Sequence, residues 1–571
     1  MDKISYRQGD MEIRVLDDLV KVFHDEAPRP SVQPEAWQVL RNDRLSFQLA
    51  FCGTPPRADT ERWDRVRFVR AETEGPLARY ATLRSVEAVP VRYSAHPGTP
   101  DSLYLRKAPG LYPDVLQPLR HGIVAVVRDQ WRSLWVDLEI PRDAEAGEQS
   151  LTICLLDPVS GEETASVEIT VQVLPFVLPD QTFPRTEWFH CDCLADYYHV
   201  PIFSEAHWIL LEAYIRAAVR RGINMILTPH FTPPLDTAVG WERPTTQLVE
   251  VWREEGKYRF DFARLVRWIR LCRLCGVRFF EMSHLFSQWG AVAAPKIVGW
   301  ENGEEKQLFG WDTRADGEAY AAFLRVYLPS LREVLRAEGV EADCWFHISD
   351  EPNLGQLESY AAARELVREA LEGCHFFEAL SDEAFYRRGC VDVPVCGTDH
   401  IEPFLANRTD HLWTYYCTAQ SSHVSNCFIA QSSGVTRLYG AQMYKFGIEG
   451  SLRWGYNFYY TAYSYESINP FLVNDSGGCF PAGDPFIVYP GTDGQPLESI
   501  RMMVLDDAFR DLRALKALEE AIGKEKVMEM VDDGLREPLR FDRFPDPPED
   551  GRYVLLLRRK VNLALAKTAM S

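Results

Sequence analysis

An apolar segment of this chain runs straight into two adjacent carboxylates: Cys344-Trp345-Phe346-His347-Ile348-Ser349-Asp350-Glu351-Pro352-Asn353. Pro352 then forces a turn, because a proline disfavours continued regular structure in the residue before it. In barrels of parallel strands, catalytic groups lie at the carboxyl ends of the strands. The stretch therefore predicts a barrel strand that carries two acids on its rim.

Strand-like and helical patterns alternate on both sides of this stretch. Helical spacing of apolar residues occurs in His207–Arg221, Phe262–Cys275, Ala319–Ala337 and Leu357–Leu371. Eight strand candidates lie within about 275 residues, and eight is the number of strands in a (β/α)8 barrel. A doubly wound open sheet is the alternative. The eight candidates are Thr186–Cys191, Asn224–Pro229, Arg278–His284, Asp343–Ser349, His375–Leu380, Val393–Gly397, His411–Cys417 and Ser451–Phe458.

The residues before this region are β-rich. Leu45–Phe51, Ser133–Ile140 and Ala165–Val173 are strand-like, and turn signals lie between the second and the third. Short strands separated by turns are typical of a β-sandwich. The sequence therefore predicts three parts: a β-sandwich domain (1–180), a TIM-like (β/α)8 catalytic barrel of α/β class (181–498) and a helical C-terminal extension (499–571).

The composition excludes a fully disordered chain and a collagen-like chain. Of the 571 residues, 46% are hydrophobic and 25% are charged, which is globular composition. The net charge, 62 − 83 = −21, repels phosphate backbones, so we expect no nucleic-acid partner. No apolar run is long enough to span a membrane. Thirteen scattered cysteines, with no apolar segment in Met1–Tyr6, predict reduced thiols, no secretory signal and a cytoplasmic location. A homo-oligomer is compatible with the sequence.

The adjacent carboxylates suggest acid–base chemistry. Asp350 and Glu351 cannot both ionise freely, so the pKa of one should rise and leave a proton available for donation. A glycosidase pairs such an acid with a second carboxylate that stays charged. The order Ser-Asp-Glu-Pro also suits the N-terminus of a helix, where acids interact with the helix dipole. The local sequence leaves both interpretations open.

Aromatic residues are concentrated in and after the seventh and eighth strand candidates. Sugars pack their C–H faces on such rings, and tyrosine hydroxyls bond sugar oxygens; ordinary barrel filling is the alternative. Polar side chains also follow several strand candidates, on what should be one rim of the barrel. The substrate-binding candidates are Tyr415, Tyr416, Trp454, His190, Asp192, His230, His284 and Asn457.

The patterns for metal and cofactor binding are weak. His190, Cys191 and Cys193 contain zinc-type ligands, but the one-residue spacing is tight and no matching second pair follows. Cys272 and Cys275 lie on a predicted amphipathic helix, which favours a role in the core. The chain contains no glycine-rich phosphate loop, nucleophile elbow or H-E-x-x-H motif. We therefore expect neither a metal nor a cofactor.

Four features together resemble glycoside hydrolase family 123, the β-N-acetylgalactosaminidases. One is the Asp350-Glu351 pair after an aromatic strand. The other three, in chain order, are residues 188–198 (WFHCDCLADYY), 452–458 (LRWGYNF) and 483–491 (GDPFIVYPG) with Ser499-Ile500-Arg501 following. The resemblance covers roughly residues 130 to 530. Members of that family are often exported, whereas this chain shows no signal.

The resemblance implies a retaining, substrate-assisted hydrolysis of terminal β-linked N-acetylgalactosamine, or of a related 2-acetamido sugar, without a cofactor. The acetamido oxygen of the substrate would act as the nucleophile and form an oxazoline. Asp350 would orient the acetamido N–H, and Glu351 would serve as general acid and then base. A tyrosine that bonds the acetamido carbonyl is also implied, with Tyr415 and Tyr416 as candidates. Two alternatives remain: a non-catalytic carbohydrate-binding barrel, and a metal-dependent hydrolase that uses His190, Cys191 and Cys193.

Overall fold

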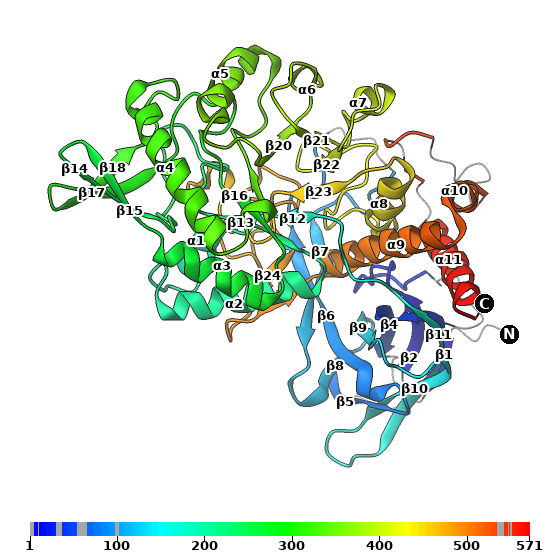
Figure 1. Ribbon diagram of the computed structural model, residues 1–571. Helices are drawn as coiled ribbons and strands as arrows, with labels where there is room; N and C mark the ends of the chain where they lie inside the picture. Colours follow the sequence, from blue (N-terminus) through cyan, green and yellow to red (C-terminus); the bar gives the residue numbers. More distant parts are fainter. Residues whose placement is uncertain are drawn as a thin grey trace.

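The chain folds into N-terminal sheets, a central barrel and C-terminal helices (Figure 1). The structure is a computed structural model, and it describes residues 5–8, 11–29, 37–53, 66–97, 102–533, 542–545, 547–548 and 551–570. Met1–Ile4, which are part of the stretch without an apolar signal, lie outside the described residues.

Eight parallel strands close into a barrel, as the sequence predicted. The first strand pairs with both the second and the eighth, which excludes an open doubly wound sheet. Several strands are shorter than predicted because their last residues already belong to rim loops; Cys191, for example, begins a helix. The strands are β12 (Arg185–Glu187), β13 (Met225–Thr228), β16 (Phe279–Met282), β19 (Cys344–Phe346), β20 (His375–Leu380), β21 (Val393–Gly397), β22 (Trp413–Tyr415) and β23 (Gly450–Arg453).

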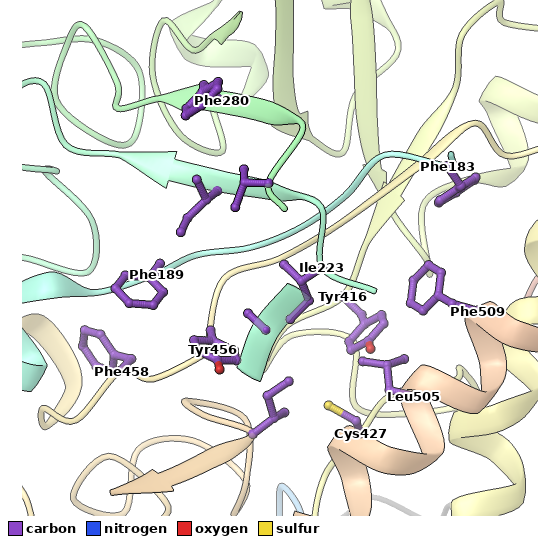
Figure 2. Close-up of a cluster of buried hydrophobic side chains, with 14 of the residues drawn as sticks. Phe183, Phe189, Ile223, Phe280, Tyr416, Cys427, Tyr456, Phe458, Leu505 and Phe509 are labelled. Atoms are coloured by element: carbon purple, nitrogen blue, oxygen red, sulfur yellow. The ribbon is translucent and has the colours of Figure 1, made fainter. Parts of the chain in front are cut away.

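Successive side chains of the barrel strands point alternately inward and outward. Trp413 and Tyr415 of β22 belong to the hydrophobic cluster that fills the barrel. Tyr416 belongs to the outer cluster, in which Figure 2 shows it with Leu505 and Phe509 of a C-terminal helix. A Cβ atom on Gly450 of β23 would lie 2.0 Å from the Trp413 ring, so glycine there makes room for the indole.

Helices surround the barrel. The four helices predicted between strands are confirmed, with ends that differ by three residues or fewer. A four-stranded sheet formed by loops after β13 and β16 was not predicted, and it consists of β14 (Glu250–Glu254), β15 (Lys257–Asp261), β17 (Ile297–Glu301) and β18 (Glu304–Phe309). The helices are α1 (Cys191–Tyr197), α2 (Glu205–Arg220), α3 (Ala263–Cys275), α4 (Glu318–Ala337), α5 (Leu357–Arg368), α6 (Ala384–Arg387), α7 (Glu402–Ala406) and α8 (Ser433–Lys445).

The N-terminal region contains two sheets that share one hydrophobic cluster. The first sheet has the order β1 (Ser5–Gln8), β2 (Met11–Asp17), β4 (Asp43–Gly53), β9 (Trp131–Ile140), β6 (Ala81–Val91) and β7 (Gly110–Pro118). The second has the order β3 (Trp37–Arg41), β11 (Glu163–Val177), β10 (Gly147–Leu156), β5 (Val66–Glu74) and β8 (Ile123–Val127).

Buried ion pairs attach the first of these sheets to the C-terminal helices. Arg44 of β4 donates hydrogen bonds of 2.6 Å to both Asp506 and Asp507 of α9 (Ile500–Ile522). Arg501, also on α9, binds Asp114 of β7. α10 (Lys524–Asp533) and α11 (Arg552–Met570) complete the predicted helical C-terminal part. Among the described residues, we find no helix that could span a membrane.

Candidate active site

A cavity of about 390 Å³ opens at the carboxyl ends of the barrel strands. Its size is typical of a site for one small ligand. Two adjacent carboxylates, Asp350 and Glu351, face it, and six of the other fifteen lining residues are aromatic. The lining residues are Trp188, Leu235, Asp236, Gln288, Trp289, Asp350, Glu351, Ala379, Tyr415, Cys417, Thr418, Leu452, Trp454, Ala462, Tyr463, Cys479 and Phe480.

The loop after β19 presents the two acids through an unusual backbone. Glu351 has φ = 42°, a left-handed conformation that costs a non-glycine residue about 1–3 kcal/mol and is concentrated at functional sites. The carbonyl of Asp350 accepts a hydrogen bond of 2.8 Å from the backbone N–H of Trp289. The helix cap that the sequence also allowed here is made by Asn353, which forms a capping box with Gln356. The two acids are therefore free of that role and face the cavity.

The environment raises the pKa of both acids. Burial raises the pKa of Asp350 well above its ordinary value, and the nearby charges of Glu351 and Glu378 add to the effect. Burial also raises the pKa of Glu351, against the opposing effect of Tyr415, whose hydroxyl donates a 2.7 Å hydrogen bond to Glu351 Oε1. A carboxyl group with a raised pKa can hold and release a proton near neutral pH, as a general acid must.

A buried ion triad supports the end of β19. His347 places its Nε2 atom 2.6 Å from Glu281 and its Nδ1 atom 2.8 Å from Glu378. Burial alone would lower the pKa of His347, but the two carboxylates raise it to about 9, so the ring is an imidazolium at neutral pH. The other oxygen of Glu378 accepts the backbone N–H of Ser349, at 2.9 Å, and the hydroxyl of Tyr360. The triad therefore holds the backbone directly before Asp350.

Two groups of side chains bear on metal binding. Ligand-type atoms of His284, His347 and Glu378 lie within 4.8 Å of one another, and both ring nitrogens of His347 are bonded to the carboxylates of Glu281 and Glu378. His190, Cys191 and Cys193 form no such group within the described part of the chain. The Cys193 sulfur instead accepts the backbone N–H of Tyr459, and His190 Nε2 lies 3.0 Å from the Trp454 carbonyl. The His190, Cys191 and Cys193 set is therefore not arranged as a zinc site.

Four of the ten predicted site residues line the cavity: Asp350, Glu351, Tyr415 and Trp454. Three others form a buried support beside it. Asp192 accepts both arms of the Arg243 guanidinium, at 2.8 and 2.7 Å. The Asn457 side chain bonds the backbone N–H and carbonyl of His190. His190, Asp192 and Asn457 were predicted to contact the substrate. In the structure their polar side-chain atoms are bonded to other protein groups instead.

The remaining three predicted residues are also absent from the cavity wall. His230 bonds the Ser283 carbonyl and lies 3.0 Å from the Tyr327 hydroxyl. His284 stacks on His347 with ring centroids 4.1 Å apart. Tyr416 packs outside the barrel, at right angles to Tyr439. Tyr416 directly follows Tyr415, the last residue of β22. Because successive side chains point in opposite directions, Tyr416 points away from the barrel interior that Tyr415 faces.

Several residues of the site were not predicted. Glu281 and Glu378 are isolated charges within apolar strands, a pattern that indicates a buried ionic partner, and both bind His347. Trp188 opens the stretch that resembles family 123, and its indole N–H bonds Glu281 at 2.6 Å. Asp236 and Trp289 lie in loops without periodicity. No local pattern places them at the cavity, because the loop conformation alone brings them there.

Comparison with solved structures agrees with this architecture. A family 123 glycoside hydrolase from Clostridium perfringens, studied for glycolipid glycan hydrolysis, shares the fold with a TM-score of 0.72, 13% identity and coverage of 98% of both chains. A β-glucuronidase from Bacteroides uniformis (TM-score 0.29, 10% identity, covering 89% of this chain and 49% of that one) and one from Ruminococcus gnavus (0.31, 8%, 89% and 99%) are too distant in structure to inform the fold.

The sequence itself supplies the assignment. No curated protein sequence matches the chain. A profile of the glycoside hydrolase 123 catalytic domain matches residues 188–518, more than half of the chain and nearly all of the barrel. The chain therefore belongs to glycoside hydrolase family 123 and is a glycosidase.

Proposed function

We propose that the protein releases terminal β-linked N-acetylgalactosamine by a retaining, substrate-assisted mechanism. The observation that carries this proposal is the pair of neighbouring acids, Asp350 and Glu351, on the wall of one aromatic cavity. Asp350 and Glu351 are neighbours on one loop, which suits two acids that act on the same side of the sugar. A carboxylate that acts as nucleophile would have to stand apart from the acid, about 5–5.5 Å away. We therefore assign the nucleophile to the 2-acetamido group of the substrate.

In the first step, the acetamido carbonyl oxygen attacks C1 of the sugar. The ionised form of Asp350 accepts a hydrogen bond from the acetamido N–H and stabilises the positive charge that develops on the amide, and this charge in turn opposes the effects that raise the pKa of Asp350. Glu351 donates its proton to the glycosidic oxygen as the C1–O bond breaks. The products of this step are the free leaving-group alcohol, an ionised Glu351 and an N-protonated oxazoline (an oxazolinium ion) that remains in the cavity, with its N–H bonded to Asp350.

In the second step, Glu351 takes a proton from a water molecule that attacks C1. The C1–O bond to the former acetamido oxygen breaks, the amide is restored, and Glu351 regains its proton. Two inversions at C1 give net retention of configuration. The Tyr415 hydroxyl donates to Glu351 in the free enzyme and also lies on the cavity wall, so Tyr415 is our candidate for the tyrosine that bonds the acetamido carbonyl.

A third carboxylate, Asp236, also lines the cavity, and burial raises its pKa to about 6. A protein carboxylate that acts as nucleophile forms a glycosyl-enzyme ester and needs no acetamido group. Asp236 Oδ2 accepts the backbone N–H of Tyr463 at 3.0 Å, which gives this carboxylate a role in holding the loop. The requirement for the acetamido group therefore distinguishes the two mechanisms.

The test is a panel of 4-nitrophenyl β-glycosides of N-acetylgalactosamine, N-acetylglucosamine and galactose. We expect nitrophenol release from the first, no measurable release from galactose, and competitive inhibition by N-acetylgalactosamine-thiazoline, which mimics the oxazoline. The rate on N-acetylglucosamine measures the preference at the 4-hydroxyl. Comparable turnover of the galactoside would exclude the acetamido nucleophile, and binding without turnover of every 2-acetamido glycoside would favour a carbohydrate-binding protein.

The Tyr415→Phe variant should shift the pH dependence of activity. Tyr415 stabilises the ionised form of Glu351, so its loss should raise the pKa of that acid and move the alkaline limb of the kcat/KM profile upward by about one pH unit. The measurement is kcat/KM for the nitrophenyl substrate between pH 4 and pH 9. Tyr416→Phe is the matched control, because Tyr416 packs outside the barrel. An unchanged alkaline limb in Tyr415→Phe would contradict the assignment.

A further inference from the structure

Two of the thirteen cysteines are neighbours at the amino ends of two adjacent barrel strands. Trp345 of β19 and His375 of β20 are register partners in this parallel pair, and their rings stack with centroids 4.7 Å apart. Cys344 and Cys374 come directly before these two residues, so they lie next to each other as well. Adjacent strands are about 4.8 Å apart, and a disulfide joins Cα atoms that are about 4.4–6.8 Å apart. The backbone spacing at this pair therefore suits a disulfide.

The two thiols also face the same layer of the protein. Cys344 is a fully buried member of the outer hydrophobic cluster, between the barrel and its helices, and Cys374 packs against that cluster. Burial raises the pKa of Cys344, and the negative charge of Cys374 is the next largest cause of the increase. Such an effect needs a short distance between the two sulfur atoms, because charge interactions weaken with distance. Both cysteines are free thiols in the structure.

Cys374 is the member of the pair that a reagent can reach, because its side chain is partly exposed. Burial and the charge of Glu341 raise the pKa of Cys374, whereas the charges of three arginines oppose this increase: Arg332, Arg336 and Arg364. The Nε and Nη1 atoms of Arg364 are buried and have no hydrogen-bond partner among the described residues. The arginines therefore favour a negative charge on Cys374, and the thiolate is the form of cysteine that attacks other sulfur atoms.

We propose that Cys344 and Cys374 are a site of reversible disulfide formation, with a small-molecule disulfide as the oxidant. The Cys374 thiolate attacks one sulfur of the oxidant, forms a mixed disulfide and displaces one small thiolate. The Cys344 thiolate then attacks the Cys374 sulfur and displaces the second small thiolate. Two protein thiols are thereby oxidised to one disulfide, the oxidant is reduced to two thiols, and the two protons pass from the protein thiols to the released thiolates.

The disulfide joins β19, which leads to the catalytic acids, to β20 at the end of the barrel opposite to the cavity. Groups at the amino ends of barrel strands contribute to stability, whereas the carboxyl ends carry the chemistry. A link here restricts the unfolded chain over residues 344–374, so we expect the oxidised protein to unfold at a temperature roughly 5 °C higher than the reduced protein. This measurement needs no substrate and is therefore independent of the proposed function.

The experiment incubates the full-length, folded protein with oxidised glutathione. The remaining thiols are then blocked with N-ethylmaleimide, and the digested protein is analysed by mass spectrometry. We expect two peptides joined through Cys344 and Cys374, and dithiothreitol should return both cysteines to the free, labelled form. Thermal unfolding of the oxidised and the reduced protein measures the shift in Tm. The wild-type protein suffices for both measurements, so the test does not depend on the folding of a variant.

Serine variants identify the order of the two steps. Cys344→Ser should stop at a mixed disulfide between glutathione and Cys374, without the rise in Tm. Cys374→Ser should leave Cys344 unmodified, because that thiol is fully buried. Cys52→Ser is the matched control, since Cys52 of β4 is also a partly exposed free thiol, and it should form the link as the wild type does. The proposal is overturned if wild-type Cys374 carries only glutathione, or if it stays reduced while the exposed Cys479 is modified.

Discussion

The Glu351→Gln variant is expected to lose about 100- to 10,000-fold in kcat/KM on a disaccharide substrate, the usual contribution of a general acid. The amide keeps the size of the side chain and can still accept the Tyr415 hydrogen bond, so the loss reports the missing proton. The wild-type rate should fall as pH rises above the raised pKa of Glu351, because the ionised acid cannot protonate the leaving oxygen. The variant should lack this alkaline limb.

The matched variant Asp350→Asn separates the two roles. Nitrophenolate leaves readily without protonation, so Glu351→Gln should lose less in its first step on the nitrophenyl glycoside than on the disaccharide. Asp350→Asn should lose similar factors on both substrates, because the acetamido group must be oriented whatever the leaving group is. Measuring kcat/KM for both variants on both substrates provides the test. The opposite pattern, with the leaving-group dependence in Asp350→Asn, would reverse the assignment of the two acids.

The His347→Gln variant is expected to destabilise the barrel by about 3–5 kcal/mol. His347 is fully buried between Glu281 and Glu378, and a neutral amide would leave two buried carboxylates without a cation. The change should appear as a lower urea midpoint, followed by tryptophan fluorescence. His411→Gln is the control, since His411 pairs with Glu449 on the surface and should matter little.

The same variant should alter the dependence of stability on pH. The pKa of His347 rises from 6.5 in the unfolded chain to about 9 in the folded protein, so the folded state binds the proton more tightly. The stabilisation is fully present below pH 6.5 and is lost as pH rises through about 9. Wild-type urea midpoints should therefore fall between pH 6.5 and pH 9, and this decline should be smaller in His347→Gln. Equal declines in both proteins would exclude the imidazolium.

Much of the barrel could be predicted because its strands have short apolar patterns bounded by turns. His375–Leu380 and Val393–Gly397 begin and end as predicted, since both strands are buried along almost their whole length. The first strand was predicted to extend to Cys191 but ends at Glu187, because residues 188–190 form a rim loop and a short helix begins at Cys191. Apolar rim loops and apolar strands look alike in sequence, so strand ends were less predictable than strand positions.

Local order along the chain predicted eight strands, four of the helices between them, and the position of Asp350 and Glu351 after the fourth strand, because each of these features needs only neighbouring residues. It could not determine which of two neighbours points inward, Tyr415 at the end of β22 or Tyr416 directly after it, since both are aromatic. It also could not show that Arg243 pairs with Asp192, 51 residues away, or that Trp241 meets Ser464 across 223 residues. Tertiary structure decided these contacts, because irregular loops carry no periodicity and their partners are chosen by the closure of the barrel.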